Sequence, residues 1–564
     1  MKNFFLIIFV TFFSNVYGFK TNQSIIYTVS SVEKDSIPML KIQATFEANA
    51  TGITDLSYDN YTWGNRNLFN CIVAPRIIGE KAKITLERDS SRIRIHHAPN
   101  VKTLNFEYFL KQDTEGDLNM DNYYRPIIQK DYFHIFSLEL FIVPEAAKDT
   151  LFDITLSWKD FSTKYIVHNN YGPIESTQKL TNITINDFLE GICVGGDYRV
   201  RPLTARGGNA SFVTRGKYTT LREKDIKNLL DETVNALDRF WKKEDNEFLT
   251  VILSTVKVDF NGSTNGGMGF NNSFDAFCSD NQYTSMEQLV SLFTHELIHQ
   301  WIGLTIENDN EEEQYWFSEG FTTYYTAKLI AKNRIHQLDG SFFINEINNI
   351  IKQHYSSSVK NSPNAALTKK RFWGDRNYEK IPYNRGALFA FYLDQKIQKD
   401  SNKKLGLDDV MRTILKEAKI SKQKLTHSYF IETVNHFLTY NIKADFKRYI
   451  EDGKVIKLEG FFKSNSLAYK PVNSELKLMG LEMGGVDGKQ IISIEENSDA
   501  KEAGFRVGDK LLNYEENPES SQKVVYTTVK RNGKIIEISL IRTAKVINVP
   551  QLLNTAQNFE LIGL

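Results

Sequence analysis

Apolar and polar positions alternate in short runs through residues 22–200. Runs such as SIIYTVSSV, MLKIQATFEA and LFDITLSW repeat the two-residue period of strands that are buried on one face, and turn-forming residues separate them. Because successive side chains of a strand point to opposite faces, such runs cover a core with one face only. The pattern predicts an N-terminal β-sandwich domain over residues 19–200.

Helical spacing replaces this alternation after Thr219. The run LREKDIKNLLDETVNALDRFWKK places its apolar residues three and four positions apart, and a β-rich run, FLTVILSTV, follows it. From residue 284 to about residue 450 the pattern stays largely helical. We therefore expect a second domain over residues 201–395 and a helical domain over residues 396–470.

Strands return after Pro471. The runs GKQIISIEEN, DKLLNYEE and KVVYTTVKRNGKIIEISLIR are separated by turns that contain glycine. They predict a terminal β domain over residues 471–545, followed by a C-terminal tail over residues 546–564. The fold class that these segments predict is multidomain α+β.

The N-terminal stretch MKNFFLIIFVTFFSNVYG has the pattern of a secretory signal. Lys2 precedes an apolar run, and the small residues Val16 and Gly18 stand three and one positions before the expected cut. We expect residues 1–18 to be a signal peptide and the protein to be periplasmic or extracellular. The run is short for a transmembrane helix, so a retained anchor is the less favoured alternative, and no later stretch has the apolar length of a membrane span.

Charge and cysteine content exclude several classes of protein. The chain has 69 basic and 69 acidic residues, so no overall field favours nucleic acid or an anionic membrane. Only Cys71, Cys193 and Cys278 are present, and no two of them have the spacing of zinc ligands. They allow at most one disulfide, and we expect three small, mostly buried side chains.

The run TSMEQLVSLFTHELIHQW places candidate metal ligands on one predicted helix. Thr284 and Glu287 have the spacing of a capping box at its start. His295 and His299 are four positions apart, so their imidazoles lie one turn apart on the same face and can reach one ion. Glu296 is then placed to act as a general base on an activated water. The alternative is an ordinary amphipathic helix with a polar edge.

A metal site needs a third ligand. One extended zinc-protease signature requires glycine three residues and histidine six residues after the second histidine, but Ile302 and Thr305 occupy those positions. That class is excluded. The other route is a carboxylate from the following helix, and YWFSEGFTTYYTAKLIAK offers Glu319 near the start of one.

The two runs HELIHQW and WFSEGFTTYY together resemble the gluzincin metallopeptidases, and more closely the glycyl aminopeptidase-like family, whose members pair such a core with a PDZ domain. The resemblance implies a thermolysin-like catalytic domain over residues 201–395. It also implies one Zn²⁺ per chain, held by His295, His299 and Glu319, and a general-base role for Glu296.

A later run, YNRGALFAFYLD, matches a tyrosine that the family carries before a Lys/Arg-Gly pair. The resemblance implies that Tyr383 donates a hydrogen bond to the oxyanion that develops during catalysis. Tyr378, Tyr324 and Tyr325 remain alternatives, because a tyrosine near a helix start is often structural.

The resemblance weakens at the substrate-binding strand. Related enzymes have a Gly-x-(Met/Leu)-Glu segment that binds substrate backbone, and its glutamate holds a free α-amine. In NGGMGFNNS, the residues Gly266, Gly267 and Met268 match, but Gly269 replaces the glutamate. Little at this position then compensates for desolvating a substrate ammonium, so the enzyme either cleaves internally or uses another acid. The acids considered are Glu307, Glu311, Glu312 and Glu313.

The terminal domain resembles a PDZ domain through LMGLEMGG and IISIEENSDAKEAGFRVGDKLLNYE. Such a domain binds an extended chain as an added strand and receives its carboxylate on backbone N–H groups. The occupant would be a peptide C-terminus or a segment of this same chain. The matching residues are Gly480, Leu481, Glu482 and Met483 in the carboxylate-binding loop, and Gly504, Gly508 and Asp509 in the turn to the next strand.

These features favour a secreted zinc metallopeptidase that hydrolyses peptide bonds in a peptide or protein substrate, without a nucleic-acid partner. Two other hypotheses stay open. One is a catalytically idle scaffold that captures peptides with its PDZ-like domain, although the intact His-Glu-His-Glu set argues against it. The other is a gluzincin hydrolase that acts on a non-peptide substrate.

Overall fold

The computed structural model describes most of the chain. The described residues are 23–63, 65–147, 149–172, 177–243, 247–258, 261–476, 481–484, 490–494, 498–516, 524–541 and 545–564. The predicted signal peptide, residues 1–18, lies outside them, as does Gly480.

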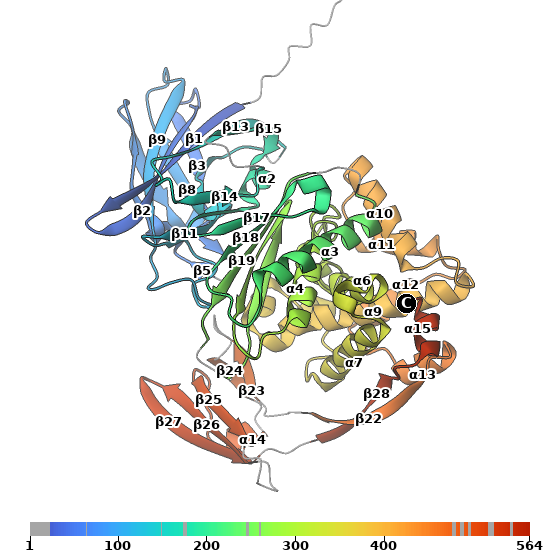
Figure 1. The fold of residues 1–564 in the computed structure, drawn as a ribbon. Helices are drawn as coiled ribbons and strands as arrows, with labels where there is room; N and C mark the ends of the chain where they lie inside the picture. The colour runs from blue at the N-terminus through green and yellow to red at the C-terminus, as the bar shows by residue number, and fades with distance from the viewer. Residues whose placement is uncertain are drawn as a thin grey trace, which may run out of the picture.

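The N-terminal region is β-rich, as predicted (Figure 1). Its largest sheet has the order β15-β13-β1-β2-β9-β6, with β1 (Gln23–Lys34), β2 (Ile37–Glu47), β6 (Ile72–Ile77), β9 (Thr103–Lys111), β13 (Leu151–Lys159) and β15 (Thr177–Thr184). A second sheet has the order β12-β3-β8-β7, with β3 (Ile53–Ser57), β7 (Lys83–Glu87), β8 (Arg92–His96) and β12 (Val143–Pro144). Tyr27, Leu56 and Ile95 from these two sheets are buried in one shared core.

A third sheet joins this region to the catalytic sheet. It has the order β10-β11-β16-β14, with β10 (Ile127–Ile128), β11 (Tyr132–Phe136), β14 (Ile166–Asn169) and β16 (Ile192–Gly196). The catalytic sheet has the order β17-β18-β19-β21-β20, with β17 (Arg199–Pro202), β18 (Ala210–Arg215), β19 (Leu249–Val256), β20 (Asn265–Phe270) and β21 (Ser273–Ser279). Short elements also present are β4 (Tyr61–Thr62), β5 (Asn65–Arg66), α1 (Ser137–Leu140) and α2 (Ile185–Leu189).

The catalytic sheet is covered on both faces, which explains why FLTVILSTV is apolar at nearly every position. Ile252 of β19 packs with Phe136 of β11, on the side of the N-terminal region. Val251 and Leu253 point the other way and share a core with α3 (Glu223–Trp241) and α4 (Met286–Ile298). Strand β20 forms one edge of this sheet and is antiparallel to β21.

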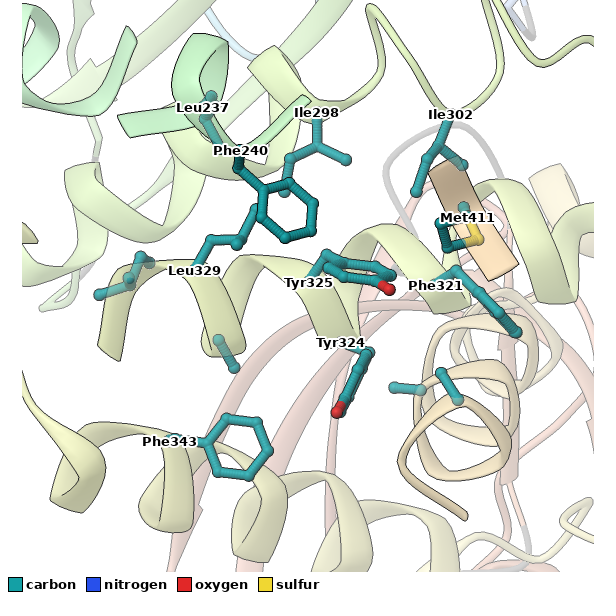
Figure 2. Close-up of a cluster of buried hydrophobic side chains, with 14 of the residues drawn as sticks. Leu237, Phe240, Ile298, Ile302, Phe321, Tyr324, Tyr325, Leu329, Phe343 and Met411 are labelled. Carbon is teal, nitrogen blue, oxygen red and sulfur yellow. The ribbon is translucent and has the colours of Figure 1, made fainter. Parts of the chain in front are cut away.

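Helix α6 lies at the centre of the helical body. Figure 2 shows its side chains Phe321, Tyr324, Tyr325 and Leu329 among residues of neighbouring helices, all within one core. The helices of this body are α5 (Glu311–Ser318), α6 (Gly320–Asn333), α7 (Gly340–Ser356), α8 (Lys369–Gly374), α9 (Arg376–Asp400), α10 (Leu407–Ser421), α11 (His427–Asn435), α12 (Lys443–Phe446) and α13 (Leu458–Ser464).

A buried ionic cluster also fixes α6. The ammonium group of Lys328 lies 2.8 Å from Asp394 of α9 and 2.7 Å from Asp408 of α10. The boundary predicted between residues 395 and 396 falls inside α9, because this helix continues past it and buries its side chains in the same core as α6 and α10. The periodic sequence pattern indicated helices on both sides of this boundary, but it could not show that those helices share one core.

The segment predicted as a C-terminal tail is ordered into two elements. Strand β28 (Lys545–Leu552) pairs with β22 (Tyr469–Leu476), and α15 (Ala556–Ile562) follows. Leu552 is buried, and its backbone exchanges hydrogen bonds of 2.8 and 3.0 Å with the Asn348 amide on α7. The tail prediction is therefore wrong, because these residues complete the core of the helical body.

The terminal β domain has a five-stranded sheet with the order β23-β24-β25-β26-β27 and a small core of its own. Its elements are β23 (Leu481–Gly484), β24 (Gln490–Ile494), α14 (Asp499–Glu502), β25 (Lys510–Glu516), β26 (Val524–Arg531) and β27 (Lys534–Ile541). Gly504 and Gly508 have φ of 88° and 93°, which favours glycine, and buried Asp509 pairs with Arg531 at 2.6 Å. The side chains of Glu482 and Met483 lie outside the described residues, and the PDZ assignment stays a prediction.

Two smaller expectations concern membranes and thiols. In the described part of the chain, no helix combines the length and apolarity needed to cross a bilayer. Cys71, Cys193 and Cys278 are all buried with free thiols, as the sequence suggested.

Candidate active site

Helix α4 carries the histidine motif and starts one residue later than predicted. Its N-cap is Ser285, whose hydroxyl accepts the N–H of Gln288 at 3.2 Å, while the Gln288 side chain accepts the Ser285 N–H at 2.9 Å. The predicted Thr284–Glu287 capping box is therefore wrong. The Thr284 hydroxyl instead donates to the carbonyl of Ser279, which closes the preceding loop.

The three predicted metal ligands converge. His295 lies in the last turn of α4, His299 caps that helix, and Glu319 lies at the junction of α5 and α6. Oε2 of Glu319 is 3.4 Å from Nε2 of His295 and 3.8 Å from Nε2 of His299. Two ligand atoms on a tetrahedral zinc ion are about 3.4 Å apart. The spacing therefore suits one ion between these side chains.

The surroundings of the three ligands also fit zinc. Oε2 of Glu319 is buried and accepts no hydrogen bond of good geometry in the described part of the chain. Nδ1 of His299 lies 3.1 Å from the carbonyl oxygen of Ile302, which suits donation by an Nδ1–H group and leaves Nε2 for the ion. A buried carboxylate oxygen and two free imidazole nitrogens form a donor set that zinc satisfies.

The charge state of Glu319 suits a ligand. Burial alone would raise the pKa of this carboxyl group, but the neighbouring imidazoles of His295 and His299 outweigh it and lower the pKa to about 2. Glu319 is thus ionised at neutral pH, as a carboxylate ligand of zinc must be.

Glu296 lies directly below strand β20. Its side chain is 9% exposed, and burial raises its pKa to about 7 even though the Gly269 N–H donates to it. A carboxylate with a pKa near the working pH can both accept and return a proton. The environment of Glu296 therefore suits the predicted general-base role.

The glycines of β20 allow this close approach. A Cβ atom on Gly267 would lie 2.9 Å from the carbonyl oxygen of Asp275 and 3.2 Å from Cγ of Glu296. On Gly269 it would lie 3.0 Å from the Glu296 carbonyl oxygen and 3.1 Å from Cβ of His299. The strand could not carry side chains there without moving away from α4, so its bare backbone edge lies beside the metal ligands.

The other two predicted substrate-binding residues, Gly266 and Met268, lie on the face of β20 that points away from α4. A Cβ atom on Gly266 would meet the Phe277 ring at 2.8 Å, and Met268 packs against an aromatic cluster. The structure thus places all four predicted substrate-binding residues on one edge strand, with only two of them turned toward Glu296.

Tyr383 of α9 completes the cluster. Its ring lies 6.1 Å from that of His295 between centroids, and the interaction with Tyr383 helps to lower the pKa of the Glu319 carboxyl group. Burial and the charge of Glu319 raise the pKa of Tyr383 well above its usual value. The phenol therefore stays protonated and can donate a hydrogen bond.

The alternative tyrosines have other partners. Tyr324 donates to Asp394, and Tyr325 donates to Asp408 at 3.2 Å, both in the ionic cluster around α6. Tyr378 packs against the guanidinium of Arg371 at 4.9 Å.

The described hydrogen bonds and ion pairs do not bring any of the four alternative acids to β20, but Glu311 lies close enough to His299 and Glu319 for their charges to affect its pKa. Glu307 pairs with Lys424 at 2.7 Å, and the carboxylate of Glu312 accepts the backbone N–H of Lys369 at 3.0 Å. Glu311 accepts hydrogen bonds from Asn308 and Ser318, and the Glu313 backbone contacts Asn364 and His427. None of these described contacts involves β20.

One neighbour of Glu296 could not be recognised from the sequence. Burial and the charge of Glu296 raise the pKa of Tyr124, which belongs to the N-terminal region. Its ring is 5.8 Å from that of Trp63, which in turn is 6.2 Å from Phe270 of β20. The N-terminal region therefore supplies an aromatic wall next to the substrate strand, and no local motif marks such long-range packing.

Comparison with known proteins agrees with this geometry. Residues 264–448 match the family model of the Peptidase family M1 domain. The chain is 28% identical over 137 residues to leucine aminopeptidase 2 of Ajellomyces capsulatus, covering 23% of this chain and 21% of that protein. It is 25% identical over 240 residues to leucine aminopeptidase 2-2 of Meyerozyma guilliermondii, covering 40% of this chain and 35% of that protein. The chain thus aligns with well under half of either relative.

The fold is also shared. The crystal structure of an aminopeptidase N family protein from Idiomarina loihiensis superposes with a TM-score of 0.75 at 15% identity, covering 96% of this chain and 99% of that chain. Residues 264–448 are therefore similar to an M1 peptidase domain, and the shared fold confirms the predicted multidomain α+β class. The narrower resemblance to the glycyl aminopeptidase-like family stays a prediction.

Proposed function

We propose that this chain is an aminopeptidase-type zinc peptidase in which Glu296 is the general base and Tyr383 stabilises the oxyanion. The observation that carries the proposal is the convergence of the ligands His295, His299 and Glu319 with these two residues beside an edge strand. A catalytically idle scaffold would not account for Glu296. This buried glutamate stands between the candidate ligands His295 and His299 in the sequence, and its pKa is raised to about 7.

Each group in the site has a separate proposed role in hydrolysis. A bound zinc ion supplies Lewis acidity at the substrate carbonyl and acidifies water. Glu296 accepts a proton from the attacking water and then delivers it to the leaving amine. Tyr383 donates its phenolic hydrogen to the carbonyl oxygen as negative charge develops there. The exposed edge of β20 aligns the substrate as an added strand.

The enzyme depends only weakly on a free substrate amine. Gly269 has no carboxylate to hold an ammonium group, and two of the acids considered as substitutes, Glu307 and Glu312, bond to residues outside β20. Peptides with a blocked N-terminus are therefore included among the proposed substrates. A library of free and N-acetylated peptides, digested by the zinc-loaded protein and followed by product sequencing, tests both reaction and position of cleavage.

We also propose that the terminal β domain is a PDZ-like module that binds the C-terminus of a peptide or a segment of this chain. The five-stranded sheet and the positive φ of Gly504 and Gly508 support it. Fluorescence anisotropy on the full chain, comparing peptides with free and amidated C-termini, tests it: equal binding of both contradicts carboxylate capture. Export through residues 1–18 is proposed from the sequence pattern alone.

A further inference from the structure

A cavity of about 610 Å³ opens next to the metal ligand His295. It lies between helices α4, α6 and α7, and Asn265 at the start of β20 also lines it. Its apolar wall consists of Leu292, Ala327, Phe342 and Ile350. A cavity of this size accommodates a large side chain of a substrate that lies along β20.

Two carboxylates from facing helices line the cavity. Glu287 lies in the first turn of α4, and Glu346 lies one turn from Phe342 on α7. Burial and the charge of Glu287 raise the pKa of Glu346, so the two groups act on each other. No salt bridge joins either of them to a lysine or arginine among the described residues, and no lysine or arginine lines the cavity.

Two hydroxyl groups of the cavity are also acceptors. Thr323 donates its hydrogen to the carbonyl of Glu319, and Thr326 donates to the carbonyl of Thr322, each at 2.8 Å. The hydrogen of each hydroxyl is already used, so toward the cavity these two groups can only accept hydrogen bonds. Apolar walls combined with acceptors and carboxylates suit a side chain with an apolar stem and a cationic end, such as lysine or arginine.

The position of the cavity along β20 indicates which substrate residue would place its side chain in the cavity. Gly267 lies over Glu296, whereas Asn265 lies toward the cavity and Gly269 lies toward His299. A substrate strand that pairs antiparallel with β20, the more stable arrangement, runs from the Gly269 end to the Asn265 end. The cavity then lies on the leaving-group side of the cleaved bond.

We propose that this cavity binds the cationic side chain of the residue immediately after the cleaved bond, with Glu346 and Glu287 as its specificity-determining acids. The inference rests on the proposed peptidase function and names a substrate class for it. Lysine and arginine are preferred at that position, and acidic residues are disfavoured.

Peptides that differ only at the residue after the cleaved bond test this proposal. With lysine there, kcat/KM is expected to exceed that with norleucine by on the order of tenfold, the equivalent of one charge-assisted hydrogen bond. In the double variant Glu346→Gln with Glu287→Gln, this ratio is expected to fall toward one, because the lysine peptide loses its advantage. Glu346→Lys is expected to favour glutamate instead.

Glu432→Gln is the matched control, because this exposed glutamate on α11 lies away from the cavity and its loss leaves the lysine preference intact. A wild-type ratio near one, or a ratio that the double variant does not change, overturns the cavity assignment. Calorimetric titration of the full chain with lysinamide and norleucinamide separates the two proposals. Tighter binding of lysinamide without any turnover contradicts only the catalytic proposal, whereas turnover without a lysine preference contradicts only the cavity.

Discussion

The two ends of strand β20 offer opposite surroundings to a substrate. At the Gly269 end, the backbone lies so close to α4 that a Cβ atom would approach the Glu296 carbonyl oxygen to 3.0 Å, and no carboxylate extends from the strand. At the Asn265 end, the cavity beside His295 contains the acids Glu287 and Glu346. Under the proposed function, one edge strand aligns the peptide while neighbouring helices determine where a positive charge is recognised.

Removal of a metal ligand is expected to have the largest effect, because both ends of β20 depend on the same ion. Glu319→Ala removes the buried carboxylate that lies 3.4 Å from His295. We expect loss of stoichiometric zinc and of measurable turnover on every substrate. Elemental analysis and peptide cleavage check this, with Glu432→Gln as control. A variant that keeps both zinc and activity would remove Glu319 from the site.

Glu296→Gln is expected to lower kcat by about 10² to 10⁴-fold while zinc stays bound. The amide keeps the size of the side chain but cannot take up a proton. The loss is expected for substrates with lysine and with norleucine alike, since Glu296 lies between the two ends of the strand. Steady-state kinetics with parallel zinc analysis measures it, and full activity would contradict the general-base role.

Tyr383→Phe is expected to lower kcat by about 10² to 10³-fold, with little change in KM, because one oxyanion donor is lost. The variant Tyr378→Phe is the matched control, since that ring packs against Arg371 instead. If Tyr378→Phe lost the activity and Tyr383→Phe kept it, the two roles would have to be exchanged.

Gly269→Ala tests how tightly β20 packs on α4. The added methyl group would lie 3.1 Å from Cβ of His299, so overpacking is expected to cost about 1–3 kcal/mol of stability. Gly460→Ala is the control: nothing lies within 4 Å of its Cβ position in α13, and alanine there should stabilise the helix by about 0.5–1 kcal/mol. Thermal unfolding followed by circular dichroism compares them, and equal midpoints would contradict the close packing.

N-acetylation of the substrate is expected to have the smallest effect. Without a carboxylate at position 269, blocking the amine should change kcat/KM by no more than about fivefold, the equivalent of about 1 kcal/mol. Paired free and acetylated peptides of one sequence measure it. Complete failure on every blocked peptide would show that another acid holds the amine.

The sequence predicted which helices carry the site residues more accurately than it predicted where those helices begin. The four-residue spacing of His295 and His299 and the position of Glu319 at a helix start were correct, because both follow from local helix geometry. The capping box was displaced by one residue, since Thr284 and Ser285 are equally suitable caps and only the contact of Thr284 with Ser279 decides between them.

Contacts between segments that are distant in the sequence could not be predicted from such local patterns. The helix that crosses the predicted boundary at residue 395 and the strand in the predicted tail both belong to a core that joins segments distant in sequence. Tyr124 and Glu346 were missed for the same reason: one comes from the N-terminal region and the other from α7, and neither belongs to a recognisable run.

The sequence by itself predicted that His295 and His299 share one helix face with Glu296 beside them, because residue spacing on a helix fixes which side chains lie together, and it offered Glu319 as a candidate third ligand. Only the tertiary structure decided that Gly269 fits against α4 and that Glu287 and Glu346 face one cavity. Those relations depend on how separate helices and an edge strand pack together, and packing brings together residues whose order along the chain does not reveal their proximity.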